Sequence, residues 1–420
     1  MTLPEHKRDK KKTAIVIGGG IIGLTTAYCL SKKGVRVTVI DPGFSDCRAS
    51  TATAGIIGGS SVIPWASSTL WPRLPAHLLK RNGPLGIALP LPTDLLGFVK
   101  NSVIAGRPET RKKSAKGLAN LGLRGWDYWQ SLLVDLPEAR SLFKQTGCLF
   151  FCETNEQLNI ENENNIIRRE FSMDITDLCA DEMKTLIPSL KTSVAGGSCV
   201  NLAGHVTDPL ALQEILKKAI LSLGASLIKS NVLGFTKCKG KVSAVKVESK
   251  EYRADTIILS AGAGSAGLAK DLGNNIPMVP AWGTSVTFTN TDINLKTPFL
   301  ILSDGFAVTH SKLGLRVSGL LQIGGEGRVN KMTDTLIYHA KKLFGNFSYS
   351  KILRLTGPRP LTADSLPFLG QDPHYSNIFH NFGHGHWGLT HAAVSAKIMT
   401  DLIIGLTPEI DISLYRVNRY

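Results

Sequence analysis

Three glycines near the start of the chain have the spacing of a phosphate-binding loop. Gly18, Gly20 and Gly23 follow an apolar run that ends at Ile17. Gly18 allows a tight turn, Gly20 allows the backbone to approach a pyrophosphate, and Gly23 allows the next helix to pack closely. Asp41 ends the following apolar run, where a carboxylate can bind an adenosine ribose. The pattern predicts a dinucleotide site. Asp41 argues against NADP, because a 2′-phosphate requires a basic partner, and NAD and FAD both stay open.

A strand–helix–strand unit must position these residues. The apolar run 14–17 predicts a buried strand, and residues 35–40 predict a second one. Between them, residues 21–33 predict a helix that Gly34 ends. The N-terminal N–H groups of that helix would bind the pyrophosphate. The chain therefore begins as an α/β protein.

A second glycine triplet has the same spacing but lacks this context. Gly262, Gly264 and Gly267 follow an apolar run at 256–259. A second nucleotide site would need a full helix and then a strand that ends in an acid. Gly273 instead ends a short helix, and prolines follow at 277 and 280. We expect these glycines to let the chain pass close to the first cofactor.

The rest of the chain changes from mixed α/β to β-rich. Residues 113–133 predict one amphipathic helix, whereas the polar segment 153–173 is expected at the periphery. Asp208 is a good N-cap and Pro209 stands at the first helical position. Strands are expected at 226–228, 242–247, 256–259, 284–289 and 315–320, and a final helix at about 390–404.

The composition is that of a globular protein with a large core. Hydrophobic residues make up 43% and charged residues 19% of 420 residues, which predicts two or three domains. The seven cysteines include no Cys-x-x-Cys pair, so we expect reduced thiols in the cytoplasm and no metal site. No stretch is long and apolar enough to span a bilayer. No triad or carboxylate pair stands out, and we expect the scattered Asp and Glu residues on the surface.

The net charge of +15 has three interpretations: nucleic acid, an anionic membrane surface, or a solvated basic surface. Residues 1–12 form a basic tail that we expect to be disordered. Because the basic residues show no aromatic interleaving or RNA-module pattern, nucleic acid is not expected as a partner. The segment 63–105, with Trp65, Trp71 and several prolines, fits an irregular packed segment, a cap over a substrate site or a membrane-interface patch. We favour the packed segment and keep peripheral contact with the inner face of the plasma membrane as a hypothesis.

Motifs near the C-terminus resemble those of a flavoprotein family. They are Gly357-Pro-Arg359-Pro and, after a short apolar run, Gly383-His384-Gly385-His386-Trp387-Gly388. Together with the N-terminal glycines, the segment 50–55 and the segment 259–265, they occur in the order of the D-amino-acid oxidase / glycine oxidase superfamily. Within it, the chain looks most like the bacterial D-amino-acid dehydrogenases. The resemblance covers nearly the whole chain.

The resemblance implies FAD and an α/β fold with two parts. A discontinuous Rossmann-like domain would bind FAD and comprise residues 13–75, 196–275 and 350–420. A substrate domain with a large, mostly antiparallel sheet would comprise residues 76–195 and 276–349. The residues expected to bind FAD come from both ends of the chain and its middle. They are Ile17, Gly18, Gly20, Ile21, Ile22, Gly23, Asp41, Ser50, Ala54, Gly55, Val232, Ala261, Gly262, Gly357, Gly383, Gly385, His386, Trp387, Gly388, Leu389 and Thr390.

The resemblance also implies three residues around the substrate. Arg359 of the Gly-x-Arg-Pro motif would bind the substrate carboxylate, for which a guanidinium is suited because it can bind both oxygens. Phe306 resembles a position where several relatives place a substrate-facing tyrosine. His386 stands where glycine oxidases have a second arginine. His384 is expected to order the loop, and Trp387 to limit the pocket.

The expected reaction is oxidative deamination of a D-amino acid. A hydride passes from the α-carbon to flavin N5, and the imino acid hydrolyses to a 2-oxo acid and ammonia. The electrons then pass to a quinone or another acceptor. The alternatives are a glycine or sarcosine oxidase, a D-hydroxyproline dehydrogenase and, from a different class, an RNA-modifying flavoprotein.

Overall fold

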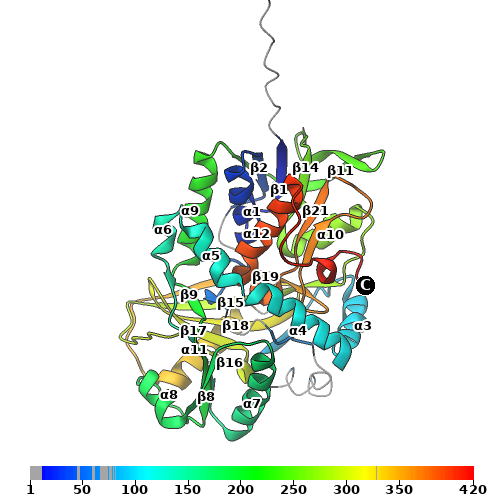
Figure 1. Cartoon of the computed structure of the whole chain (residues 1–420). Coiled ribbons are helices and arrows are strands. Elements are labelled where there is room, and N and C mark those ends of the chain that lie inside the picture. Colours follow the sequence, from blue (N-terminus) through cyan, green and yellow to red (C-terminus); the bar gives the residue numbers. More distant parts are fainter. Residues whose placement is uncertain are drawn as a thin grey trace, which may run out of the picture.

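The computed structural model describes residues 12–44, 48–58, 62–66, 74, 78, 80, 82–327 and 329–420. They form two halves, one above the other in Figure 1, each built on its own large sheet. Trp71 and residues 1–11 of the basic tail lie outside the described residues, so their predictions stay predictions. The order of the elements confirms an α/β protein whose later part is rich in strands.

The upper half contains a six-stranded sheet. Its strand order is β10-β2-β1-β14-β21-β20, and all neighbours are parallel except β20 and β21. The crossovers of such a sheet require helices, and α1 and α9 supply two of them. The bounds are β1 (Thr13–Ile17), α1 (Ile21–Lys32), β2 (Arg36–Asp41), α9 (Pro209–Ser222), β10 (Ser226–Lys229), β14 (Thr256–Leu259), β20 (Phe368–Gln371) and β21 (Ile378–Phe382).

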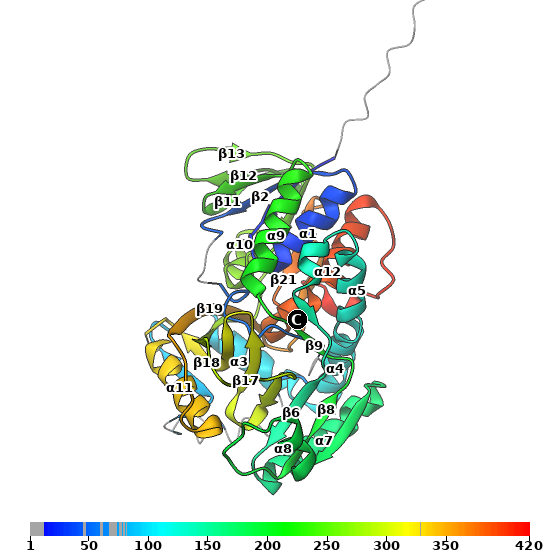
Figure 2. The same cartoon turned by 90° about the vertical axis from the view of Figure 1, so that its left-hand side faces the viewer.

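Both faces of this sheet are buried, which explains its nearly continuous apolar runs. Ala14 and Val16 of β1 share a hydrophobic cluster with α1, α9 and α12 (Gly388–Ile404). The alternate residues, Ile15 and Ile17, pack with a small sheet formed by β11 (Val232–Cys238), β12 (Lys241–Val247) and β13 (Glu251–Tyr252). Figure 2 shows the small sheet and the helices on opposite sides of the six strands.

The lower half contains a nine-stranded sheet. Its order is β19-β15-β18-β17-β16-β6-β8-β7, and β4 also pairs with β18. The pairs are antiparallel except β16–β6 and β18–β4. The bounds are β4 (Leu85–Ala88), β6 (Cys148–Cys152), β7 (Ile175–Cys179), β8 (Gly196–Val200), β15 (Met278–Thr289), β16 (Phe299–Ile301), β17 (Phe306–Ser311), β18 (Gly314–Gly324) and β19 (Ile352–Thr362).

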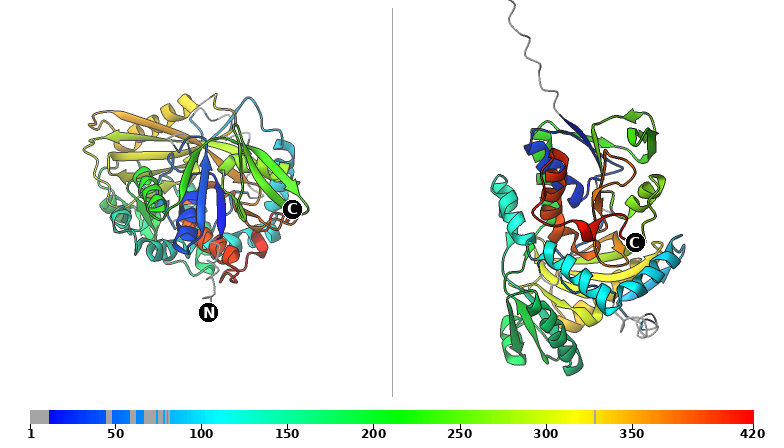
Figure 3. Two further views of the ribbon diagram at one scale, coloured as in Figure 1. Left: turned by 90° about the horizontal axis from the view of Figure 1, so that it is seen from above. Right: turned by 45° about the vertical axis from the view of Figure 1, so that its right-hand side comes forward.

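The chain passes between the two halves repeatedly. The nine-stranded sheet of one half can therefore face the six-stranded sheet of the other, with both built from segments that are far apart in the sequence. In the right-hand view of Figure 3 the large sheet, yellow to orange, lies below α12, which is red. Helices α8 (Ala180–Leu186) and α11 (Val329–Phe344) pack on the large sheet with a shared apolar cluster. A second three-stranded sheet joins β3 (Ile56–Ile57), β5 (Phe143–Lys144) and β9 (Gly204–Val206). The proposed domain limits stay a prediction, and we note that β8 and β19 belong to the large sheet.

The single helix predicted over 113–133 is wrong, because two helices occupy this region. α4 (Pro108–Gly122) and α5 (Gly125–Leu133) are separated at residues 123 and 124. The reason is tertiary: a Cβ atom at Gly125 would lie 2.5 Å from the carbonyl oxygen of Thr390. The chain therefore starts a new helix where its backbone touches α12. The neighbouring helices are α3 (Leu95–Ala105), α6 (Pro137–Arg140) and α7 (Asn155–Glu170).

Several helix ends follow the predicted chemistry. The Asp208 carboxylate accepts a hydrogen bond from the Ala211 N–H at 3.0 Å, with Pro209 at the first position of α9. The second glycine triplet forms a short 3₁₀ turn (η1, Gly262–Gly264) and the seven-residue helix α10 (Ser265–Asp271). The next strand in the described part of the chain, β15 (Met278–Thr289), does not end in an acid, so the pattern of a second nucleotide unit is incomplete here.

The expectation that the scattered carboxylates lie on the surface is wrong for a buried subset. Each has a partner that offsets its desolvation. Glu161 pairs with Arg168, Asp304 with Lys80, Asp372 with His380, Asp364 with Arg419, and Asp401 with Lys397. In the described part of the chain, no helix combines the length and apolar character that crossing a bilayer requires.

Candidate active site

A cavity of ≈ 2040 Å³ lies between the two halves. Its walls come from the six-stranded sheet at Asp41 and from Gly18 directly after β1, from the large sheet at Phe306 and Arg359, and from the turn before α12 at His386. An ordinary small-ligand pocket has roughly 300–1,000 Å³. The cavity is therefore large enough for an extended dinucleotide and a small substrate together.

Most of the residues predicted to bind the cofactor line this cavity, although they lie up to several hundred positions apart in the chain. Arg359 and Phe306, predicted near the substrate, line it as well. The lining members of the predicted cofactor set are Ile17, Gly18, Gly20, Ile21, Ile22, Asp41, Ser50, Ala54, Val232, Ala261, Gly262, Gly383, Gly385, His386, Trp387, Gly388, Leu389 and Thr390.

The other three members, Gly23, Gly55 and Gly357, lie behind the cavity wall. A Cβ atom at Gly23 would lie 1.9 Å from the Gly18 carbonyl oxygen, and one at Gly55 would lie 2.5 Å from that of Val206. A Cβ atom at Gly357 would lie 2.1 Å from the carbonyl carbon of Arg48. These glycines let backbone segments touch. They shape the wall without lining it.

The first turn of α1 presents backbone N–H groups at the cavity. Gly20 is the N-cap and has no side chain with which to cap the helix, and the first turn carries no acid. The hydroxyl of Ser50 accepts a hydrogen bond from the Ile21 N–H at 3.1 Å. A Cβ atom at Gly20 would come no closer than 3.3 Å to the protein, the nearest atom being that same hydroxyl. The helix end therefore offers positive potential beside open space, as an anion requires.

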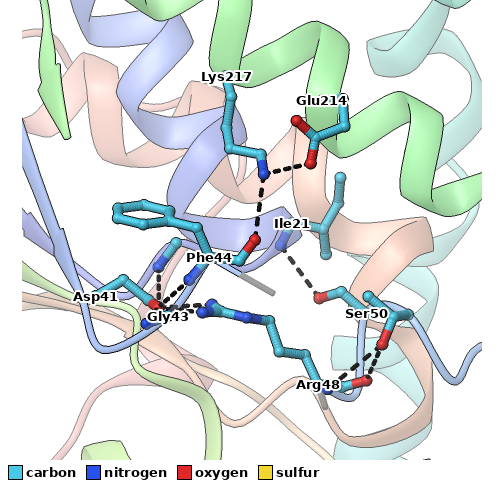
Figure 4. Close-up of polar contacts among 10 residues, drawn as sticks. Ile21, Asp41, Gly43, Phe44, Arg48, Ser50, Glu214 and Lys217 are labelled. Carbon is cyan, nitrogen blue, oxygen red and sulfur yellow. Dashed lines mark hydrogen bonds and ion pairs between the residues drawn. The ribbon is translucent and has the colours of Figure 1, made fainter. Parts of the chain in front are cut away.

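Asp41 is buried at the end of β2, and its carboxylate accepts hydrogen bonds from several protein donors (Figure 4). Its carboxylate accepts hydrogen bonds from the N–H groups of Gly19 at 2.7 Å, Gly43 at 2.9 Å and Phe44 at 3.0 Å. Both terminal nitrogens of Arg48 bind it too. Burial raises the pKa of Asp41, but these bonds outweigh it and lower the pKa to about 2. A ribose hydroxyl must therefore compete with Arg48 for this carboxylate.

The turn after β21 leaves space beside the start of α12. Gly383 and Gly385 have φ values of +83° and +52°, which favour glycine. A Cβ atom at Gly385 or Gly388 would have no protein atom closer than 3.9 or 3.8 Å. The buried His384 ring bonds the Ser395 hydroxyl at 3.0 Å, so it holds the turn against α12 as predicted. Backbone N–H groups and open volume thus meet at this end of the cavity.

Arg359 lies on β19 and reaches the cavity from below. Its Nη1 donates a hydrogen bond to the Leu320 carbonyl oxygen at 2.9 Å. Within the described residues, no carboxylate lies within salt-bridge distance of its guanidinium. Burial lowers the pKa of Arg359 to about 10, which leaves the group cationic at neutral pH. A cation at a cavity wall without a protein counter-ion can bind an anionic ligand.

An irregular point in the large sheet sets the position of this guanidinium. The pairing of β15 with β18 shifts between Trp282 and Thr284, so Leu320 and Leu321 together face Gly283. Leu320 has a φ of +56°, a left-handed conformation that a non-glycine residue seldom adopts. A Cβ atom at Gly283 would lie 2.2 Å from Cζ of Arg359. The bulge therefore turns a carbonyl toward the guanidinium, and the glycine leaves the room in which it lies.

The remaining residues predicted near the substrate line the same cavity as Arg359. Desolvation at the cavity wall and the Arg359 charge lower the pKa of His386, which lines the cavity, so its ring is neutral at pH 7. Phe306 of β17 lines the cavity and also packs in the apolar cluster under the large sheet. Trp387 is nearly buried and stacks on His391, with ring centroids 6.4 Å apart.

The sequence model of a family described as "FAD dependent oxidoreductase" matches residues 13–402. The chain belongs to this family of FAD dependent oxidoreductases. The cofactor is therefore FAD, and the protein is an enzyme.

Relatives cover nearly the whole length. The chain is 28% identical to the "D-amino-acid oxidase" of Bradyrhizobium diazoefficiens, over 96% of this chain and 98% of that protein. It is 27% identical to the "D-amino acid dehydrogenase" of Cereibacter sphaeroides, over 97% and 95%. The fold matches glycine oxidase from Geobacillus kaustophilus with a TM-score of 0.75 and 20% identity, over 98% and 100%. The first two similarities agree with the resemblance read from the motifs, and the third shows the fold.

The cavity fits FAD. The N–H groups of α1 beside Gly20 would hold the pyrophosphate, and the side near Asp41 would hold the adenosine ribose. The open space beside Gly385 and Gly388 would hold the flavin ring, with the N-terminus of α12 near the part of the ring that becomes negative on reduction. A Cβ atom at Gly262 would meet no protein atom within 4 Å, and its closeness to the cofactor stays a prediction.

Sequence reasoning missed three residues at this site. Arg48 follows the predicted acid by only seven positions, so a basic residue beside Asp41 was a visible signal. Gly283 and Leu320 carried no such signal. Their role depends on the register between β15, β18 and β19, which pair across long stretches of sequence.

Proposed function

We propose that this FAD-dependent enzyme catalyses the oxidative deamination of a D-amino acid. FAD, when bound, accepts the hydride from the substrate α-carbon, and the resulting imino acid hydrolyses in water to a 2-oxo acid and ammonia. The curated relatives carry names of D-amino-acid oxidases and dehydrogenases, which supports this substrate class. The observation that carries the proposal is the cationic Arg359 at the cavity wall, with a carbonyl as its protein partner.

In this proposal Arg359 binds the substrate carboxylate through both terminal nitrogens. Leu320 holds one edge of the guanidinium through its carbonyl, so the fork has a fixed orientation before substrate arrives. A bound amino acid is thereby oriented with its α-carbon toward the flavin, and orientation supplies much of the rate. His386, neutral beside this cation, leaves the positive charge of the site to Arg359. Phe306 and Trp387 would line the side-chain pocket with apolar surface.

An anaerobic flavin-reduction screen tests the substrate class. The FAD-loaded protein is mixed with both enantiomers of the common amino acids, and with glycine, sarcosine and hydroxyproline. We expect loss of the oxidised flavin absorbance with D-amino acids and much slower loss with their L-enantiomers. Faster reduction by glycine, sarcosine or hydroxyproline would favour those alternatives. Reduction by L-enantiomers alone would refute the D-specificity.

We further propose that the electrons leave to a quinone or another electron-transfer acceptor, and that the enzyme works in the cytoplasm with peripheral contact to the inner face of the plasma membrane. The dehydrogenase names among the relatives and the net charge of +15 support this. Admitting air to the reduced enzyme decides the acceptor. Rapid reoxidation with stoichiometric hydrogen peroxide identifies an oxidase, whereas reoxidation by a soluble quinone but not by oxygen identifies a dehydrogenase.

A further inference from the structure

Helix α3 carries apolar side chains on its outer face. At 100° per residue, Leu96, Val99, Lys100 and Val103 share one side of the helix. Leu96 is 86% exposed, and Val99 and Val103 are exposed as well. The opposite side is buried through Phe98, Ser102 and Ala105. A helix at the surface of a globular protein normally places polar residues outward, and α3 does not.

The segment that leads into α3 continues this character. Leu89 is 78% exposed, and Leu91 is exposed too. Scattered exposed apolar residues are ordinary, but a cluster along one short segment marks an interaction site. We call this the α3 surface, and its members are Leu89, Leu91, Leu96, Val99, Val103 and Ile104.

Basic side chains accompany the α3 surface. Lys100 lies on the apolar side of the helix itself, and α4, which packs against α3, adds exposed Lys112, Lys113 and Lys116. With Arg107 and Arg111, residues 85–116 hold six basic residues against two acids, Asp94 and Glu109. None of the six pairs with a carboxylate in the part of the chain that the structure describes. The charge complements an anionic surface.

The inner side of α3 belongs to the cavity. Leu95 and Phe98 line it, and Phe98 stacks on Trp65 with ring centroids 5.6 Å apart. Val99, which is 37% exposed, lies between the two sides and contributes to both the cavity wall and the α3 surface. One helix therefore separates the cavity from the α3 surface. Figure 1 shows α3 at the outer edge of the molecule beside α4.

We propose that the α3 surface docks on an anionic lipid bilayer. Its leucines and valines enter the boundary between headgroups and acyl chains, and the basic residues of α3 and α4 bind the lipid headgroups. The inference rests on the proposed membrane contact and names the surface that makes it. Docked in this way, a wall of the cavity lies at the membrane, where an apolar electron acceptor is concentrated.

Vesicle co-sedimentation of the full-length FAD-loaded protein tests the docking. The vesicles contain phosphatidylcholine with 30% phosphatidylglycerol, or phosphatidylcholine alone. We expect binding to the anionic vesicles in low salt and at least a tenfold loss of affinity for the variant Leu96→Glu/Val103→Glu. The matched control is Val134→Glu/Ile166→Glu, because these residues are 72% and 60% exposed elsewhere and the charge change is the same. The control should bind within twofold of the wild type.

Flavin absorbance, melting temperature and the rate of anaerobic flavin reduction should not change in either double variant, because neither touches the cavity. Loss of vesicle binding with unchanged reduction therefore supports the docking without reference to the substrate. If both double variants bind the vesicles equally, the proposed docking through the α3 surface is wrong. Attraction through the basic N-terminal residues alone would give this result. Absence of wild-type binding also overturns the proposal, as does a stable dimer in solution that the α3 double variant dissolves.

Discussion

The substitution Gly283→Ala tests how the sheet positions Arg359. The added Cβ atom would lie 2.2 Å from Cζ of Arg359, and 2.4 and 2.6 Å from Nη2 and Nη1. Carbon atoms in contact keep about 3.5–4.0 Å. The guanidinium must therefore move by more than about 1 Å, away from the backbone of β15. The movement also strains its bond to the Leu320 carbonyl, so the fork loses its orientation.

The magnitude follows from the carboxylate bonds that this movement breaks. A hydrogen bond to a charged group contributes about 1.5–3 kcal/mol, so loss of one arm of the fork weakens carboxylate binding roughly 10- to 100-fold. Benzoate titration, followed by the flavin spectrum, measures that affinity without turnover. The rate of anaerobic flavin reduction by the preferred substrate should fall as well, because a misplacement of about 1 Å costs up to about 10²-fold.

Two comparisons guard this experiment. Gly97→Ala adds a Cβ atom that meets nothing within 4 Å, and it should leave benzoate affinity unchanged. In an Arg359→Lys background, which lacks the planar guanidinium, Gly283→Ala should weaken benzoate binding by less than a further factor of about three. The effects of two residues in contact are not additive, so the second substitution has little left to disturb. Benzoate affinity of Gly283→Ala equal to that of the wild type would refute the positioning argument.

Three further predictions concern the cofactor end of the cavity and the pH profile. Arg48→Met removes the cationic partner of Asp41. Because the pKa of Asp41 is lowered to about 2 in the folded protein, the ionised carboxylate stabilises the fold above about pH 4, and this stabilisation is lost as the pH falls through about 2. We expect a loss of about 3 kcal/mol at pH 7 and an acid-unfolding midpoint at higher pH, measured by circular dichroism; an unchanged midpoint contradicts the ion pair's role. Gly20→Ala adds a Cβ atom whose one contact within 4 Å is the Ser50 hydroxyl at 3.3 Å, which a shift of a few tenths of an ångström relieves, so the apoprotein's melting temperature should change little. FAD affinity should fall at least roughly tenfold through loss of close pyrophosphate contact, as measured by calorimetric titration with FAD; unchanged affinity would mean that the pyrophosphate binds elsewhere. Because its pKa is lowered, His386 is neutral from pH 6 to 9 and should not titrate in this range. The profile of kcat/KM against pH should therefore have the same shape in the wild type and in His386→Asn between pH 6 and 9.

The strand–helix–strand unit at the start of the chain could be predicted because its signals are local. Gly18, Gly20, Gly23 and Asp41 lie within one strand–helix–strand unit, whose glycine spacing and apolar period are legible without tertiary information. The structure refines the reasons. Gly23 lets the backbone of α1 touch Gly18 and does not line the cavity.

The substrate half could be predicted only through motifs. Arg359 was found through its resemblance to family members, but what orients it comes from strands that pair across long sequence distances. Neither the left-handed backbone conformation of Leu320 nor the register shift between β15 and β18 has a recognisable pattern in the sequence. The break between α4 and α5 has the same origin, because it depends on the contact of Gly125 with α12. The apolar periodicity of the sequence predicts one helix there, whereas the packing of the folded chain produces two.

The most direct test of the account compares an amino acid with its carboxamide. The D-amino acid that reduces the flavin fastest and its amide differ only in the group that Arg359 is proposed to bind. For the wild type we predict that anaerobic reduction, as kred/Kd, favours the acid at least roughly 100-fold, and that Arg359→Ala removes most of this preference. If Arg359→Ala kept the preference of the wild type, the carboxylate would bind elsewhere and the central claim would be wrong.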